Sequence, residues 1–137
     1  MLTYIINIFL QQIDINRYTV ENSNAQKLIK QIQGEIISKG IDANTIIPEL
    51  KKLREFALLE ENPVVVKALR LAYEHIEKNN DFLIQIPSDE PVDENEINEF
   101  GSTNTESLNY LLSLMLDLEN KHNILDLKDY NKLMLEF

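Results

Sequence analysis

Apolar residues recur at helical spacing along most of this chain, and residues that reverse the chain direction are scarce. Over residues 22–40 five apolar residues form a stripe in which all but one neighbouring pair lie three or four residues apart: Ala25, Leu28, Ile29, Ile32 and Ile36. This spacing gathers them on one face of a helix, whereas a strand would divide them between its two faces. Only three glycines and four prolines occur in 137 residues, which is few for a hairpin-rich sheet. The sequence therefore predicts an all-α fold, a compact bundle of five or six helices.

Capping residues mark several of the expected helix ends. Asn62 can cap a helix that has Pro63 at its first position, and Gly40 can end the preceding stretch in a left-handed conformation. Thr103 and Glu106 have the spacing of a capping box. Pro48 suits a first turn, which leaves the start of the third helix open. Six helices are expected, near residues 3–14, 22–39, 46–59, 63–79, 104–121 and 123–137.

The length predicts a single domain, which we divide into three parts. Residues 1–80 form a four-helix part, residues 81–102 an extended segment and a long acidic loop, and residues 103–137 a C-terminal helical hairpin. The stretch 81–87 (DFLIQIP) either lies as coil against the helices or pairs with its own copy. A two-helix hairpin cannot bury its own apolar face, so it packs on the first four helices or on a second subunit. The second alternative implies a homodimer through the hairpin.

The net charge of −10 is concentrated in one segment. Residues 1–78 and 121–137 are each neutral in sum, and no Lys or Arg lies between Lys78 and Lys121. Six carboxylates fall within residues 88–101: Asp89, Glu90, Asp93, Glu94, Glu96 and Glu99. Such a run repels phosphate, so nucleic acid is not an expected partner. It would attract a basic protein, and the alternative is a solvated loop that only aids solubility.

Composition excludes several other kinds of chemistry. The chain has no cysteine, which excludes disulfides, thiol nucleophiles and cysteine-bound zinc. The apolar N-terminus lacks basic residues and is interrupted at Asn7 and Gln11, which disfavours a secretion signal or a membrane span. Glycines only at positions 34, 40 and 101 leave no phosphate-binding loop. We expect a cytoplasmic protein without cofactors and without membrane contact.

Arg70 and His75 lie five residues apart on the predicted helix 63–79. Five steps of about 100° separate them by about 140° around the helix, so they diverge within one subunit. The six residues RLAYEH match an R-x4–6-H motif, and in this motif the chain resembles the HEPN class of helical ribonucleases. The resemblance implies that Arg70 and His75 are catalytic, in an active site formed across a dimer. The position after the arginine is usually polar in that class and is Leu71 here.

A second acid–histidine pair, Glu119 and His122, continues the apolar stripe of the predicted helix 104–121. Carboxylate-bridged di-iron bundles use this spacing, but they need two such motifs, and the chain's other histidine lacks a glutamate three residues before it. The calcium-loop pattern that starts at Asp93 breaks at Ile97. No metal site is predicted, and the pair is interpreted as a helix-end contact favoured by the macrodipole.

These observations favour protein–protein contact without catalysis. The contact surface is expected to be either the acidic loop 88–101, binding a basic partner, or the exposed part of the C-terminal hairpin. An immunity or antitoxin-like role, in which the protein masks a basic enzyme, is consistent with the charge. The alternative function is that of a HEPN-like ribonuclease with Arg70 and His75 at a dimeric site.

Overall fold

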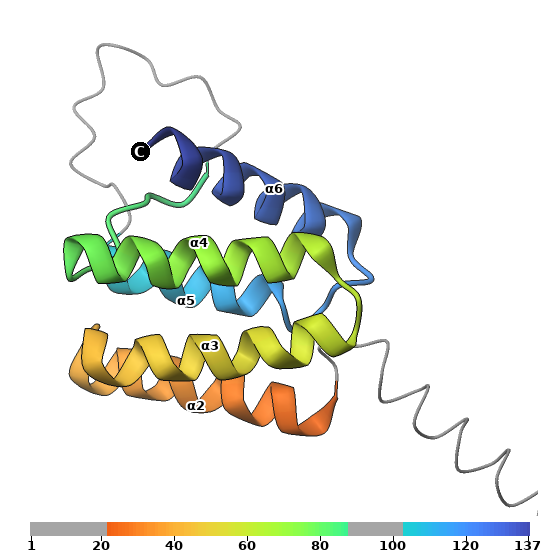
Figure 1. Ribbon diagram of the computed structural model, residues 1–137, viewed down its shortest axis with the longest axis horizontal. Helices are drawn as coiled ribbons and strands as arrows, with labels where there is room; N and C mark the ends of the chain where they lie inside the picture. Colours follow the sequence, from red (N-terminus) through yellow and green to blue (C-terminus); the bar gives the residue numbers. More distant parts are fainter. Residues whose placement is uncertain (1–21, 88–102) are drawn as a thin grey trace, which may run out of the picture.

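The computed structural model describes residues 22–87 and 103–137, which form a compact bundle of five helices and contain no β-strand (Figure 1). The helices are α2 (Ser23–Lys39), α3 (Ala43–Leu59), α4 (Pro63–Asn79), α5 (Asn104–Leu114) and α6 (Lys121–Glu136). The predicted all-α bundle is confirmed. The helix expected near residues 3–14 lies outside the described residues.

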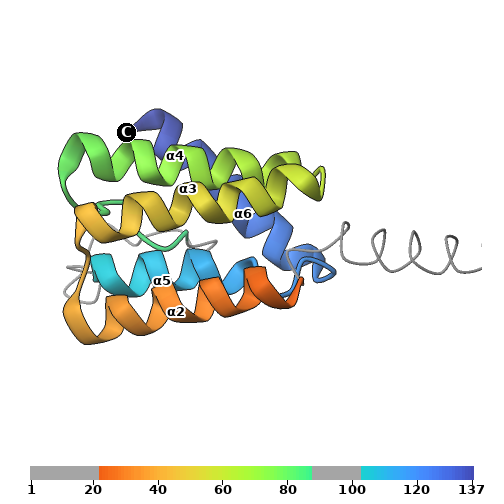
Figure 2. The same ribbon diagram turned by 60° about the horizontal axis from the view of Figure 1, so that its bottom comes forward.

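The helices pack mostly with neighbours that are close in the sequence, apart from two long-range pairs. α3 lies antiparallel to α2 and to α4, while α5 packs along α2 and α6 along α4. In Figure 2, α2 and α5 lie side by side beneath α3 and α4, and α6 crosses the body at an angle to the others. Both C-terminal helices therefore bury their apolar faces on the earlier helices of the same chain.

The core is filled by aliphatic side chains from all five helices. The α3 residues Ile46, Leu50, Leu53 and Ala57 are buried, as is most of the predicted α2 stripe. Two aromatic residues are fully buried with them, Tyr130 of α6 and Phe82 of the segment 81–87. That segment is coil, with Phe82 and Ile84 in the core. Its pairing with a second copy stays a prediction.

α3 starts earlier than the helix predicted near residues 46–59. The Asp42 side chain accepts a hydrogen bond from the Asn44 N–H at 3.1 Å, so α3 begins at Ala43 and Pro48 lies inside it. Pro48 lacks the N–H that would bond the Asn44 carbonyl. Because Asn44 and Pro48 are both exposed, water can reach this carbonyl. The expectation that Pro48 belongs to a first turn is wrong.

The predicted helix 104–121 is also wrong at its C-terminal end. α5 ends at Leu114, where the next two N–H groups bond carbonyls only three residues back. The Asn123 amide donates to the carbonyls of Leu114, at 3.4 Å, and Asp117, at 2.8 Å, which supplies partners that the helix end lacks. Asn120 then caps α6. The chain changes direction here, between two helices rather than within one.

Asn22 caps α2. The caps predicted for other helices are confirmed, and Asn62 caps α4 with Pro63 at its first position. The Thr103 hydroxyl accepts the Glu106 N–H at 3.1 Å at the start of α5. Gly40 ends α2 with a φ of 78°, a region that favours glycine. Among the described helices, none is long and apolar enough to cross a membrane.

Candidate functional site

Arg70 points away from the core and forms an ion pair with Glu74. Its Nη1 lies 3.4 Å from both carboxylate oxygens of Glu74, one turn further along α4. Both side chains are largely exposed. An exposed pair at this spacing contributes only a few tenths of a kcal/mol, about 0.3–0.5.

His75 is buried on the opposite side of the same helix, with only 7% of its surface exposed. Its Nε2 accepts the backbone N–H of Leu83 at 3.0 Å, and its ring meets the edges of Phe82 and Phe137 at centroid distances of 5.6 and 4.7 Å. Because Nε2 accepts, the proton of the neutral ring is on Nδ1. Burial lowers the pKa of His75, an effect that Asp81 opposes and Lys78 reinforces.

The structure does not bring Arg70 and His75 together. α4 is one continuous helix from Pro63 to Asn79, so residues five apart keep an angular separation of about 140°. His75 already uses Nε2 to accept the Leu83 N–H, and the Asn79 amide donates to the His75 backbone carbonyl at 2.9 Å. In one subunit these contacts favour a structural role for His75, and a dimeric active site stays the alternative.

The six carboxylates predicted as a binding surface, Asp89, Glu90, Asp93, Glu94, Glu96 and Glu99, lie outside the described residues. The described part has nine basic and nine acidic residues in 22–87, and three basic and six acidic residues in 103–137. Most of the net charge of −10 therefore belongs to the segment 88–101.

Glu119 and His122 do not share a helix. Glu119 lies in the turn after α5 and His122 in the first turn of α6, where its N–H donates to the Asn120 side chain at 3.0 Å. Both side chains are exposed. The interpretation of this pair as the end of a helix stripe is wrong, because α5 stops at Leu114. Among the described residues no cluster of three or more acidic or histidine side chains could hold a metal ion.

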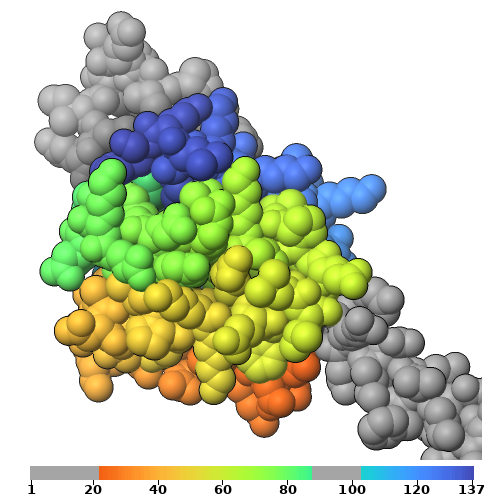
Figure 3. Space-filling model, viewed as in Figure 1, coloured from red at the N-terminus to blue at the C-terminus, as the bar shows by residue number. Residues whose placement is uncertain are grey.

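A surface groove runs between the N-terminal half of α4 and the C-terminal half of α6, with a volume of about 530 Å³. In Figure 3, α6 lies along the surface of α4 on the face shown. Pro63 and Val64 of α4 and Leu135 of α6 are its apolar lining. Leu135 is 59% exposed. We define the α4–α6 groove by these residues together with Lys67, Lys128, Asn131, Lys132 and Glu136.

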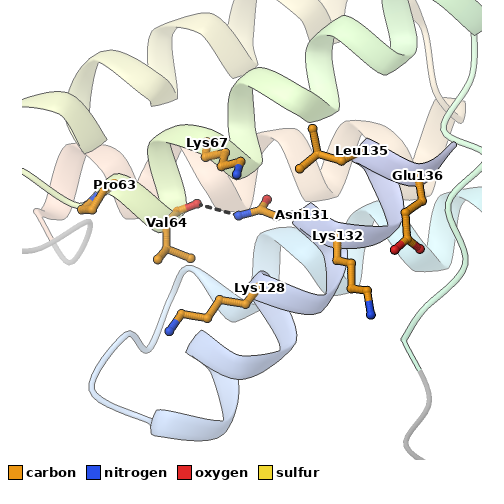
Figure 4. Close-up of a pocket in the computed structure, with 8 residues that line it drawn as sticks. All are labelled: Pro63, Val64, Lys67, Lys128, Asn131, Lys132, Leu135 and Glu136. Atoms are coloured by element: carbon orange, nitrogen blue, oxygen red, sulfur yellow. Dashed lines mark hydrogen bonds between the residues drawn. The ribbon is translucent and has the colours of Figure 1, made fainter.

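Asn131 joins the two walls of the α4–α6 groove. Its Nδ2 donates to the Val64 carbonyl at 3.3 Å, across 67 residues of sequence (Figure 4). The residue is buried, and its Oδ1 has no hydrogen-bond partner among the described residues. An amide fixed in this way holds the walls at a set separation.

Three lysines surround the groove, one from α4 and two from α6. Figure 4 shows Lys67 on the α4 side and Lys128 and Lys132 on the α6 side. All three are exposed, and none forms an ion pair with a carboxylate of the described part of the chain. Glu136 is the one acidic side chain that lines the groove. The groove therefore combines an apolar lining with three lysines that no carboxylate of the described residues pairs.

A second, more apolar hollow adjoins the first at Pro63. Leu58, Pro63 and Val66 line it beside Glu61 and Asn62, with a volume of about 340 Å³. Because Pro63 lines both hollows, the apolar surface continues from the α4–α6 groove to the turn between α3 and α4.

Two carboxyl groups face each other across α2 and α3. Burial, followed by a hydrogen bond to Glu35 and repulsion from its charge, raises the pKa of Glu49 to about 7. One oxygen of each group is buried without a partner among the described residues. This pair carries part of the pH dependence of the fold, and two carboxyl groups alone do not define a ligand site.

The order of residues around α6 carries a signal for the groove. Leu133 is 37% exposed, whereas the polar Asn131 is buried. Taking Leu127 as the origin, Asn131 lies about 40° away and Leu133 about 120° away. Leu135 and Lys128 follow Asn131 around the helix. That order places a buried amide beside an exposed leucine and a lysine.

Comparison with models of known protein families found no match, and neither curated proteins nor solved structures gave a match. The roles assigned to residues of this chain therefore rest on its own geometry.

Proposed function

We propose that this chain acts by contact with another protein, without catalysis, and that the α4–α6 groove is the contact surface. The observation that carries the proposal is the exposed Leu135 in a groove whose three lysines have no partner in the described residues. An apolar side chain among unpaired charges is what a protein partner covers, because the contact removes apolar surface from water and pairs the charges at its edge.

The acidic segment 88–101 is a second proposed contact, of opposite sign. Its six carboxylates would attract a basic partner over roughly a Debye length, about 8–10 Å. Neutralising Asp93, Glu94 and Glu96 to their amides should then weaken binding of that partner, and rising salt should do the same. If neither the amide substitutions nor higher salt weakens binding, the segment 88–101 is not the contact surface.

Site-specific photo-crosslinking in living cells tests the groove. A photoreactive amino acid at position 135 should form a discrete crosslink to a partner protein, because this position is at the surface of the groove. The matched control is position 125, on the same helix, at which the leucine is 55% exposed and does not line the groove. Equal crosslinking at both positions, or none at either, would contradict the proposal.

A further inference from the structure

We propose that the occupant of the α4–α6 groove is an amphipathic helix with acidic side chains flanking its apolar face. This inference rests on the proposed function and names the chemistry of the partner. It runs against the net charge of −10, which by itself points to basic partners. The local surface differs from the whole because the acids are concentrated elsewhere in the sequence.

The positions of the lysines require negative charge on both sides of the occupant. Lys67 lies on the α4 wall and Lys128 and Lys132 on the α6 wall, so the three ammonium groups border the apolar lining from both sides. Carboxylates along only one side of an occupant would leave one wall unpaired. A helix satisfies both walls, because residues on either flank of its apolar stripe project to opposite sides.

The size of the groove matches about two turns of helix. The α6 wall extends over the eight helical steps from Lys128 to Glu136, or about 12 Å at 1.5 Å per residue. An apolar pair at i and i+4 spans about 6 Å along a helix axis and fits within this length. A longer occupant reaches past Pro63 into the adjoining hollow lined by Leu58 and Val66.

The groove is formed before any partner binds. The hydrogen bond from Asn131 to the Val64 carbonyl sets the spacing of its walls, and Val64 and Asn131 belong to helices that the core already fixes. Binding to a formed groove requires less ordering than binding to a mobile surface. Nucleic acid is a poorer occupant, because the lining between the lysines is apolar and bases would find no aromatic side chain there.

Selection from a peptide library tests the chemistry of the occupant. A displayed library of random peptides of about 14 residues, long enough for about four turns, is selected on the full chain. The variant K128E/K132E serves as counter-selection. The selected peptides should carry Leu or Ile at i and i+4 and an excess of Asp and Glu on both flanks. A peptide family without this acidic excess would overturn the proposal.

Binding of the best peptide is then measured by fluorescence anisotropy against matched variants. K128E/K132E should weaken it at least about tenfold, and raising salt from about 50 to about 500 mM should weaken binding to the natural chain. K27E/K30E makes the same change of charge at exposed lysines of α2 outside the groove and should have little effect. L135A should weaken binding several-fold, whereas L125A should not.

The outcomes separate the partner's chemistry from the contact surface itself. A control peptide carries Lys in place of every Glu of the selected peptide. If it binds with equal affinity and L135A still weakens that binding, the acidic character of the occupant is contradicted, whereas the groove is still supported as the contact surface. If crosslinks also fail to form at position 135, both proposals fall. Self-association of the chain that K128E/K132E abolishes would assign the groove to a second copy. Single-stranded RNA bound in its place would likewise overturn the proposal.

Discussion

The backbone N–H of Leu83 donates to Nε2 of His75 at 3.0 Å, and this bond fixes residues 81–87 to the side of α4. The same ring contacts Phe137, the residue that follows α6, at a centroid distance of 4.7 Å. One buried imidazole therefore joins α4 to a coil segment and to a third element. Nε2 can accept the Leu83 N–H only while it is unprotonated.

Acid should destabilise the fold through His75. Its folded pKa is lowered from 6.5, first by burial, so the unfolded chain takes up the proton first as pH falls. The His75 contribution is fully present above the unfolded pKa and is lost as pH falls through the folded value. Urea unfolding at about pH 7.5 and about pH 5.5 should show that the free energy of unfolding falls more between these pH values in the natural chain than in H75A. Equal losses would show that His75 is not the titrating group.

Removal of the Tyr130 hydroxyl should destabilise the junction of α5 and α6. The hydroxyl donates to the Ser107 carbonyl at 2.9 Å and lies 3.1 Å from the Ser107 Oγ, all fully buried. Y130F removes both buried contacts of the hydroxyl with Ser107 and should lower the free energy of unfolding by about 1–2 kcal/mol. The control is Y73F, since the Tyr73 hydroxyl makes no hydrogen bond to a described residue. A change in unfolding midpoint no larger than that of Y73F would contradict the prediction.

Glu49→Gln should stabilise the protein above neutral pH. The raised pKa of about 7, against 4.5 in the unfolded chain, means that the carboxyl contributes fully below pH 4.5 and that this stability is lost as pH rises through 7. E49Q removes the loss, so its free energy of unfolding should exceed that of the natural chain at about pH 8 by about 1–3 kcal/mol. E55Q, at an exposed position of the same helix, is the control. A gain that persists below pH 4.5 would point to another cause.

RNA incubated with the purified chain should remain intact. His75 is buried and its Nε2 accepts a bond within the chain, whereas Arg70 is paired with Glu74 on the other side of α4. R70A should leave stability nearly unchanged, and H75A should lower it by about 1–3 kcal/mol. Cleavage of RNA that both substitutions abolish would establish the ribonuclease alternative. Sedimentation of the active species would then show whether the site is dimeric.

Local signals predicted the helices that begin with strong caps. Asn62 caps the first turn of α4, and Pro63 has a backbone conformation that suits its first position. Both effects are local, so the sequence alone predicted the start of α4 correctly. The apolar spacing of α2 likewise predicted its buried face. These features depend on neighbours within one or two turns.

Long-range contacts decided the features that the sequence did not predict. α5 stops at Leu114 because Asn123, nine residues later, supplies a donor for its carbonyl. Asn131 is buried because Val64, 67 residues earlier, accepts its amide hydrogen. Neither partner is visible in a window of one or two helical turns. The α4–α6 groove could not be predicted for the same reason.

The early end of α5 determines whether the α4–α6 groove exists. Had the helix continued straight to residue 121, seven more residues would have carried the chain about 10 Å further along the same axis. α6 would then start beyond the region where Asn131 meets Val64, and Lys128 and Lys132 would face solvent with no opposing wall. Substitutions that extend α5 across residues 115–120 should therefore abolish the α4–α6 groove, although every residue that lines it is unchanged.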